Sequence, residues 1–174
     1  MAEFLPKAQR AALKAIELDE TLPEAHDALS AILEYEYDWA GTERELRRAI
    51  ELKPDYPSAH HRYALLLSLT GRRAEATAEA ERALRLDPTS VPINNILVWA
   101  LYSSRESSRT IEQAKKTLEL DSGYLPALDF LSRALMAQGR YAEAVVEMKR
   151  GGAMAPAQRG DRTQGAATAR AAGR

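Results

Sequence analysis

Ala49-Ile50-Glu51-Leu52-Lys53-Pro54 is a phrase that this chain repeats. Related copies read Ala15-Ile16-Glu17-Leu18, Ala83-Leu84-Arg85-Leu86-Asp87-Pro88 and Thr117-Leu118-Glu119-Leu120. The copies begin at residues 15, 49, 83 and 117, so each step is 34 residues long. A fixed period between about 20 and 50 residues is typical of repeat architectures. The sequence therefore predicts a stack of similar units.

Between the copies, apolar residues recur every three or four positions, which indicates helices. A leading helix is expected over residues 5–18, and it matches only the second half of a unit. Its first-half partner is absent, which indicates a piece of a longer protein. Four helix pairs are expected to follow, at 23–36 and 39–52, 57–70 and 73–86, 91–103 and 107–120, and 125–138 and 141–150. The predicted fold is all-α, with a half-repeat followed by full repeats at about 23–56, 57–90, 91–124 and 125–156.

Proline and glycine mark the expected ends of these helices. Pro54 forbids continuation of the helix before it. Gly71 and Gly139 are 68 residues apart, two periods, and each can close a helix in a left-handed conformation. The third pair has no glycine at its turn, 104–108, so a looser or wider bend is expected there. The last helix is expected to stop early, at Gly151-Gly152.

Composition excludes several classes of protein. The 174 residues carry a net charge of −1 and include no cysteine, so disulfides and thiolate metal sites are impossible. No apolar run approaches the roughly 20 residues of a membrane span, and the first residues do not resemble a secretory signal. We therefore expect a cytoplasmic protein without membrane association.

Few residues suggest catalysis or metal binding. His26 and His60 are one period apart, which favours packing over a metal site, and His61 is the only other histidine. No glycine-rich phosphate loop occurs, and nothing orients His61 as a catalytic triad requires. The sequence predicts no cofactor, no metal and no enzymatic activity.

The segment 157–174 differs from the rest of the chain. It consists mostly of Ala, Gly, Arg, Gln and Thr, without a large apolar residue, so a disordered tail is expected. Four arginines against Asp161 give it a charge of 4 − 1 = +3, which leaves −1 − 3 = −4 for residues 1–156. That negative charge disfavours nucleic-acid binding. The tripeptide Arg159-Gly160-Asp161 has the spelling of an adhesion motif, which we interpret as coincidence.

The period and its landmark residues resemble the tetratricopeptide repeat family over about residues 5–156. The leucine-type landmarks of the first helices are Leu29 and Leu33, Tyr63 and Leu67, Leu97 and Leu101, and Leu131 and Leu135. Small residues open the second helices, at Thr42, Ala76, Thr110 and Ala144. The prolines at the ends of units are Pro54, Pro88 and Pro156. The stretch Tyr35-Glu36-Tyr37-Asp38-Trp39-Ala40-Gly41 is also similar to arrays in bacterial signalling proteins, where they follow a winged-helix or kinase domain that is not found in this sequence.

This resemblance implies a right-handed superhelix whose first helices line a concave face that binds a protein or peptide. Helical phase selects the residues expected on that face. They are Glu24, Asp27, Glu34, Tyr35, His61, Leu65, Leu69, Asn95, Trp99, Tyr102, Asp129 and Arg133. The face would be acidic at its N-terminal end and aromatic in the middle, which suits a partner with basic residues and a large apolar anchor. Trp99 and Tyr102 could equally be packing residues, and the lone Arg133 argues against a basic clamp for peptide carboxylates.

Other functions remain open from the sequence. Apolar ends of the array could support self-association into a homo-oligomer. The binding surface could be the convex rather than the concave face. An enzyme or RNA-binding module is the least favoured hypothesis. The sequence does not identify the partner.

Overall fold

The structure, a computed structural model, describes residues 4–153 and contains helices and turns without a strand in that range. The prediction of an all-α helical-repeat fold is confirmed. The helices are α1 (Phe4–Leu18), α2 (Pro23–Tyr35), α3 (Trp39–Leu52), α4 (Pro57–Leu69), α5 (Arg73–Leu86), α6 (Val91–Ser103), α7 (Ser107–Leu120) and α8 (Leu125–Ala137). A further helical segment spans 141–153. The limits of α1 to α8 agree within one residue with those expected from the periodicity. The expected tail, 157–174, and Pro156 lie outside the described residues.

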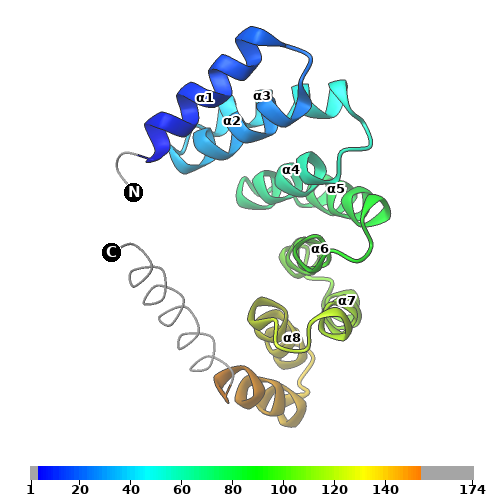
Figure 1. Cartoon of the computed structure of the whole chain (residues 1–174). Helices are drawn as coiled ribbons and strands as arrows, with labels where there is room; N and C mark the ends of the chain where they lie inside the picture. Colours follow the sequence, from blue (N-terminus) through cyan, green and yellow to red (C-terminus); the bar gives the residue numbers. More distant parts are fainter. Residues whose placement is uncertain (1–3, 154–174) are drawn as a thin grey trace, which may run out of the picture.

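The helices stack one pair upon the next along an arc (Figure 1). Within pairs, α2 packs on α3, α4 on α5 and α6 on α7, and each pair joins the next through α3–α4, α5–α6 and α7–α8 contacts. In addition, α4 contacts α6 and α6 contacts α8. Figure 1 places these first helices on the inner side of the arc, with α5 and α7 on the outer side. We call the surface formed by α2, α4, α6 and α8 the inner face.

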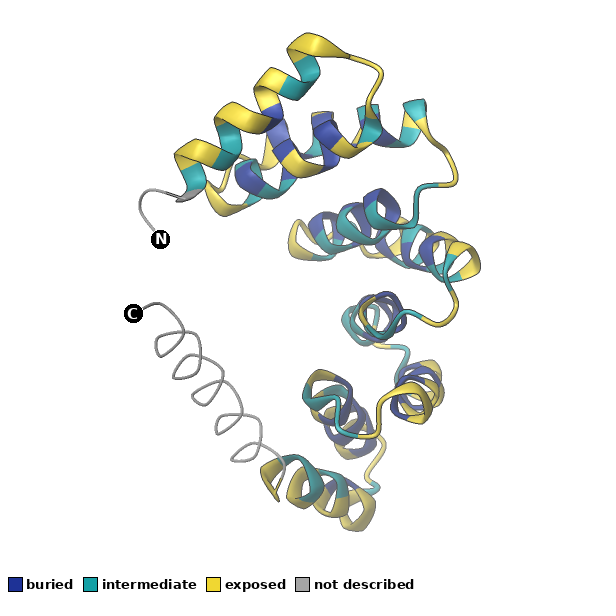
Figure 2. Cartoon of the chain, in the orientation of Figure 1, coloured by how far each residue is buried: buried dark blue, intermediate teal, exposed yellow. Residues whose placement is uncertain are grey.

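Leucine stripes form the interior of the stack. Leu46, Leu67 and Leu101 are each at most 1% exposed, and so is Leu131 of α8. Burying one such side chain contributes roughly 1.5–3 kcal/mol, so neighbouring pairs stabilise helices that would be marginal alone. Figure 2 shows the buried positions where helices meet and the exposed positions on their outer surfaces.

The leading helix α1 packs against α2 through a narrow stripe. Ala12 is buried against Leu29 and Ile32, with Leu5 and Ile16 beside them. Ala11, next to Ala12 in the sequence, is exposed. Contact with one neighbouring helix thus buries only part of the circumference of α1.

All four turns within the helix pairs have the same geometry. The residues at the bend are Tyr37, Gly71, Arg105 and Gly139, with φ values of 62°, 78°, 61° and 72°. In the third turn the Arg105 amide donates to the Tyr102 carbonyl at 2.9 Å, and the Glu106 amide donates to the Leu101 carbonyl at 3.0 Å. The second turn repeats this pattern with Gly71 to Ser68 and Arg72 to Leu67. The looser third bend was therefore a wrong prediction: helix packing on both sides holds Arg105 in a left-handed conformation despite its side chain.

The last helical segment continues through Gly151 and Gly152 to the final described residue. The early stop predicted there was wrong, because glycine weakens a helix by only about 1 kcal/mol and does not by itself end one. Arg150 anchors the segment by donating to the Ser122 carbonyl at 2.7 Å.

A search of residues 4–153 for a long, apolar helix able to cross a membrane found none.

Candidate functional site on the inner face

The N-terminal part of the inner face is a polar junction between α2 and α4. Asp27 is buried and accepts hydrogen bonds from the Ser58 hydroxyl at 2.7 Å and the Tyr56 hydroxyl at 3.2 Å. Its other oxygen lies 3.2 Å from Arg62 Nε. Burial, with the Asp27 charge adding to it, raises the pKa of Tyr56 and keeps this phenol protonated. Asp27 therefore joins two repeats, which helical phase alone did not indicate.

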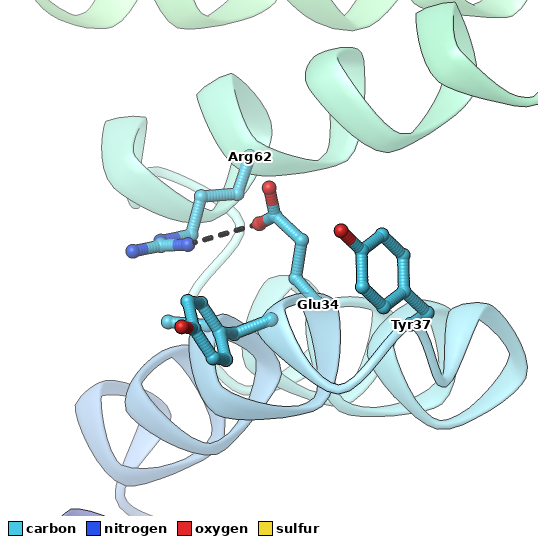
Figure 3. A pocket seen from close by; sticks show the side chains of 5 residues that line it. Glu34, Tyr37 and Arg62 are labelled. Carbon is cyan, nitrogen blue, oxygen red and sulfur yellow. Dashed lines mark hydrogen bonds and ion pairs between the residues drawn. The ribbon is translucent and has the colours of Figure 1, made fainter. Parts of the chain in front are cut away.

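A hollow of about 350 Å³ lies beside this junction. Its lining is Ala31, Glu34, Tyr35, Tyr37 and Arg62. Figure 3 shows Glu34 of α2 and Arg62 of α4 pointing toward each other across it, at 3.3 Å. Tyr35 and Tyr37 are exposed, so the hollow presents aromatic rings beside an ion pair.

Aromatic side chains continue along the outside of the first pair. Tyr37 meets Trp39 edge-on, with ring centroids 5.7 Å apart and planes at 82°. Edge-to-face pairs of this kind are favoured by the ring quadrupoles. Trp39 is 37% exposed, and so the rim of the hollow keeps free aromatic surface.

The middle of the inner face is less polar. His61 is half-buried, and burial, reinforced by the charge of Arg62, lowers its pKa, which favours the neutral imidazole. Leu65 is partly buried against the core, whereas Leu69 is 48% exposed. This part offers a neutral ring and aliphatic surface.

An aromatic shelf occupies the C-terminal part, and we define it as Trp99, Tyr102 and Phe130. Trp99 and Phe130 are stacked with centroids 6.4 Å apart and planes at 23°. Tyr102 lies 5.3 Å from Phe130, centroid to centroid. All three are partly buried, and Trp99 also packs against the core. The packing and binding interpretations of Trp99 therefore both have a physical basis.

Polar residues border the shelf. Asn95 is half-buried, and its Oδ1 is buried without a hydrogen-bond partner. Asp129 and Arg133 are both exposed and form an ion pair at 2.9 Å. The hydrogen bond from Arg133 to Asp129 raises the pKa of the guanidinium, so Arg133 is committed to a neighbouring carboxylate. At the other end of the face, exposed Glu24 lies 3.5 Å from Lys53.

The residues expected on this face thus fall into three groups. Exposed at its surface are Glu24, Tyr35, Leu69, Asp129 and Arg133; half-buried are Glu34, His61, Leu65, Asn95, Trp99 and Tyr102; and buried is Asp27. Arg62 and Phe130 also contribute to this face, although helical phase had not selected them. Arg62 lies four residues after Ser58 and three before Leu65, a spacing that could have placed it on the same helix face.

The two paired histidines lie between the helices of their own repeats. His26 Nδ1 lies 2.8 Å from Glu45 and His60 Nδ1 lies 2.6 Å from Glu79. Their Nε2 atoms lie within hydrogen-bond distance of the backbone carbonyl oxygens of Glu20 and Pro54, respectively. In the third repeat Asn94 and Gln113 occupy the equivalent positions and form a 2.8 Å hydrogen bond. Within residues 4–153, no group of three or more His, Cys, Asp or Glu side chains is arranged to hold a metal ion.

Comparisons with known proteins agree with this geometry. Residues 57–90 match the family model of the tetratricopeptide repeat. The solved structure of PilW, a type IV pilus biogenesis factor, superposes with a TM-score of 0.82, at 21% identity over 89% of this chain and 72% of that chain. MamA from Desulfovibrio magneticus RS-1 superposes with a TM-score of 0.79, at 16% identity over 88% of this chain and 87% of that chain.

Residues 57–90 are a tetratricopeptide repeat, and the array shares the fold of solved tetratricopeptide-repeat proteins. The solved structure of YrrB, described as a TPR protein with an unusual peptide-binding site, superposes on this array with a TM-score of 0.74. It is 18% identical over 86% of this chain and 77% of that chain. A search of curated proteins found no sequence match to the array.

Proposed function

We propose that the chain is a non-enzymatic scaffold that binds a segment of another protein on its inner face. The aromatic shelf is the observation that carries this proposal, because partly exposed aromatic residues are favoured as anchors at interface centres. The shelf lies on α6 and α8, which are neighbours on the inner side of the arc.

The chemistry of the inner face narrows the partner. A large apolar or aromatic side chain fits against Trp99, Tyr102 and Phe130. At the α2 end, the ion-pair partners of Glu24, Asp27 and Glu34 among residues 4–153 are Lys53 and Arg62, so three carboxylates against two cations leave one negative charge in excess. The partner segment would therefore carry an apolar anchor and a basic residue toward its α2-facing end.

The fold relatives are consistent with this class of function. YrrB is described by its peptide-binding site and PilW by its part in type IV pilus biogenesis. These descriptions belong to those proteins, and they support only the general kind of function proposed for this chain.

Selection from a displayed random-peptide library tests the proposal directly. Peptides enriched on the full chain should share an aromatic or long aliphatic residue and a lysine or arginine. Tyr102→Ala and Leu69→Glu should each weaken the enriched peptides by about tenfold, because both side chains offer accessible apolar surface on the inner face. The matched control is Val146→Glu, at an exposed apolar residue of the last helical segment.

Thermal melts must first establish that all three variants fold like the parent. If Val146→Glu reduces binding as much as the inner-face variants, the binding surface lies elsewhere. If no peptide family is enriched, or enrichment survives both Tyr102→Ala and Leu69→Glu, the inner face is not the site.

A further inference from the structure

The C-terminal end of the array contains a second hollow, of about 330 Å³, between α8 and the segment 141–153. Its lining is Leu125, Leu128, Asp129, Ser132, Glu147, Met148, Gly151 and Gly152. In Figure 1 this end forms the lower limit of the arc. Most of the lining is small or apolar, while the charges at its rim are paired, as in Glu147 with Arg150 at 3.4 Å.

The 34-residue register identifies what this surface is. One, two and three periods before Met148 stand Ala114, Ala80 and Leu46, each 0% exposed, whereas Met148 is 54% exposed. The corresponding equivalents of Gly151 are Thr117, Ala83 and Ala49, also 0% exposed. The hollow is therefore the same surface that is buried three times inside the array.

The internal copies also define what covers such a surface. The surface of α3 is covered by α4, that of α5 by α6 and that of α7 by α8. Around Leu46, for example, the cover consists of Tyr63, Leu66 and Leu67 from α4. The covering element is each time a helix with large apolar residues at positions i and i+4 and an apolar residue at i+3, which together form one face. These residues are Tyr63, Leu66 and Leu67 in α4, Leu97, Ala100 and Leu101 in α6, and Leu131, Ala134 and Leu135 in α8.

Residues 154–174 do not show this apolar pattern in the expected register. Continuing the register from Ala127, Leu131, Ala134 and Leu135 of α8 leads to Asp161, Gly165, Thr168 and Ala169. These residues lack the large apolar side chains that fill the internal copies. A second copy of the chain would fit poorly as well, because a two-fold dimer through this end would set one hollow against another.

We propose that the hollow at the C-terminal end docks an amphipathic helix of a partner protein, with large apolar residues at i and i+4 and an apolar residue at i+3. The docked helix would extend the stack by one first helix. This surface borders the inner face at Asp129 of α8, but Met148 and Gly151 belong to the segment 141–153, so the inference does not depend on the proposed function.

The chain itself provides a probe for this site. A fluorescein-labelled peptide with the sequence of α4, residues 57–69, is the best match, because α4 covers Leu46, the internal equivalent closest in size to Met148. Fluorescence anisotropy with the full chain should give saturable binding of this peptide.

Met148→Glu should weaken the binding of the α4 peptide about tenfold or more, since docking would then desolvate a charge. Val146→Glu, also on an exposed residue but at a position equivalent to exposed Arg44, Ala78 and Glu112, should change it less than about twofold.

Four outcomes would overturn the proposal. The first is equal binding of the α4 peptide and a scrambled peptide, and the second is equal affinity of Met148→Glu and the parent for the α4 peptide. The third is tighter binding after removal of residues 154–174, which would assign the site to that segment. The fourth is the formation of concentration-dependent dimers that Met148→Glu abolishes, which would assign the site to a second copy. Tyr102→Ala separates the two proposals, because it should impair library peptides on the inner face and leave the α4 peptide bound.

Discussion

The first two repeats and the last two hold the same fold with different chemistry. In α2 to α5, ionisable groups join the helices: Arg62 pairs with Asp27 and Glu34, and Glu43 accepts hydrogen bonds from Arg72 and Tyr63. From α6 onward the corresponding joints are a neutral amide pair and the aromatic shelf. The stability of the N-terminal half should therefore respond to pH and salt more than that of the C-terminal half.

One repeating position makes this contrast sharper. His26–Glu45, His60–Glu79 and Asn94–Gln113 are equivalent pairs that bridge the two helices of a repeat. In the fourth repeat the equivalents are Leu128 and Glu147, and Glu147 pairs with Arg150 instead. This position thus accepts a His–Glu pair, a neutral amide pair or an apolar leucine, provided that each buried polar group has a hydrogen-bond partner.

The largest expected effect concerns the buried leucines that all repeats share. Leu67→Asp should abolish the cooperative urea transition or lower its free energy by about 4 kcal/mol or more, because Leu67 is 0% exposed and the variant would bury an unpaired charge. Leu69→Asp, two residues later and 48% exposed, is the matched control and should change stability little. Circular dichroism against urea measures both. An unchanged midpoint for Leu67→Asp would refute the inward orientation of this stripe.

The next largest effect compares the loss of the His60–Glu79 bridge with the loss of the Asn94–Gln113 bridge. His60→Leu should cost about 2–4 kcal/mol, because it removes the partner of the Glu79 carboxylate and one of the two hydrogen bonds to the Pro54 carbonyl, which also accepts from Arg82. Asn94→Leu should cost only about 1–2 kcal/mol, since its partner Gln113 is neutral. Urea denaturation at pH 7 gives both values. Equal costs would mean that the ionisable character of the first bridges adds nothing to stability.

A smaller effect concerns acid. The hydrogen bond from Arg72, assisted by Tyr63 and Arg47, lowers the pKa of Glu43 from 4.5 to about 2. Because the ionised form is favoured in the folded state, this stabilisation is complete above pH 4.5 and is lost as the pH falls toward 2. The loss should be about 1 kcal/mol for this partly exposed network.

Urea midpoints measured between pH 6 and pH 2.5 test this expectation. Glu43→Gln should flatten the part of the curve below pH 4.5, whereas Glu119→Gln, at an exposed site on α7, should leave it unchanged. Hydrogen exchange at low pH should show α3 and α4 losing protection before α6 and α8. Simultaneous loss in all four helices would contradict a difference between the halves.

The smallest expected effect concerns the turns. Arg105→Gly should stabilise the array by about 0.5–1 kcal/mol, because Arg105 has a φ of 61° and glycine adopts this conformation without strain. The reverse change, Gly139→Arg at a φ of 72°, should destabilise by a similar amount. Differential scanning calorimetry of the two variants measures the pair. Destabilisation by Arg105→Gly would mean that the arginine side chain contributes more than its backbone strain costs.

The sequence predicted the helices well because their apolar residues recur in strict register, as Leu46, Leu67 and Leu101 illustrate. It failed where packing overrides a local preference. Arg105 adopts a conformation typical of glycine because the helices on both sides require it, and Gly151 stays helical beside Leu128, whose side chain a Cβ there would meet at 3.9 Å.

The inner face was only partly predictable. Helical phase selects the correct side of α6 for Trp99 and Tyr102, but it cannot reveal that Phe130 of α8 contacts both rings, since that contact joins two repeats. Phase also cannot distinguish an exposed acid from a buried one. Asp27 is buried because Ser58, Tyr56 and Arg62, which lie 29 to 35 residues away, happen to surround it.

The common geometry of the turns at Tyr37, Gly71, Arg105 and Gly139 has a consequence for how such a chain can change in length. The links between units share a backbone path as well, because Lys53, Asp87 and Asp121 at the ends of α3, α5 and α7 have φ values of −143°, −140° and −142°. Residues 57–90 could therefore be duplicated or removed as one unit without redesigning the links on either side. Unequal recombination of the gene could add or remove such a unit, and the longer or shorter array would keep the same curvature per repeat.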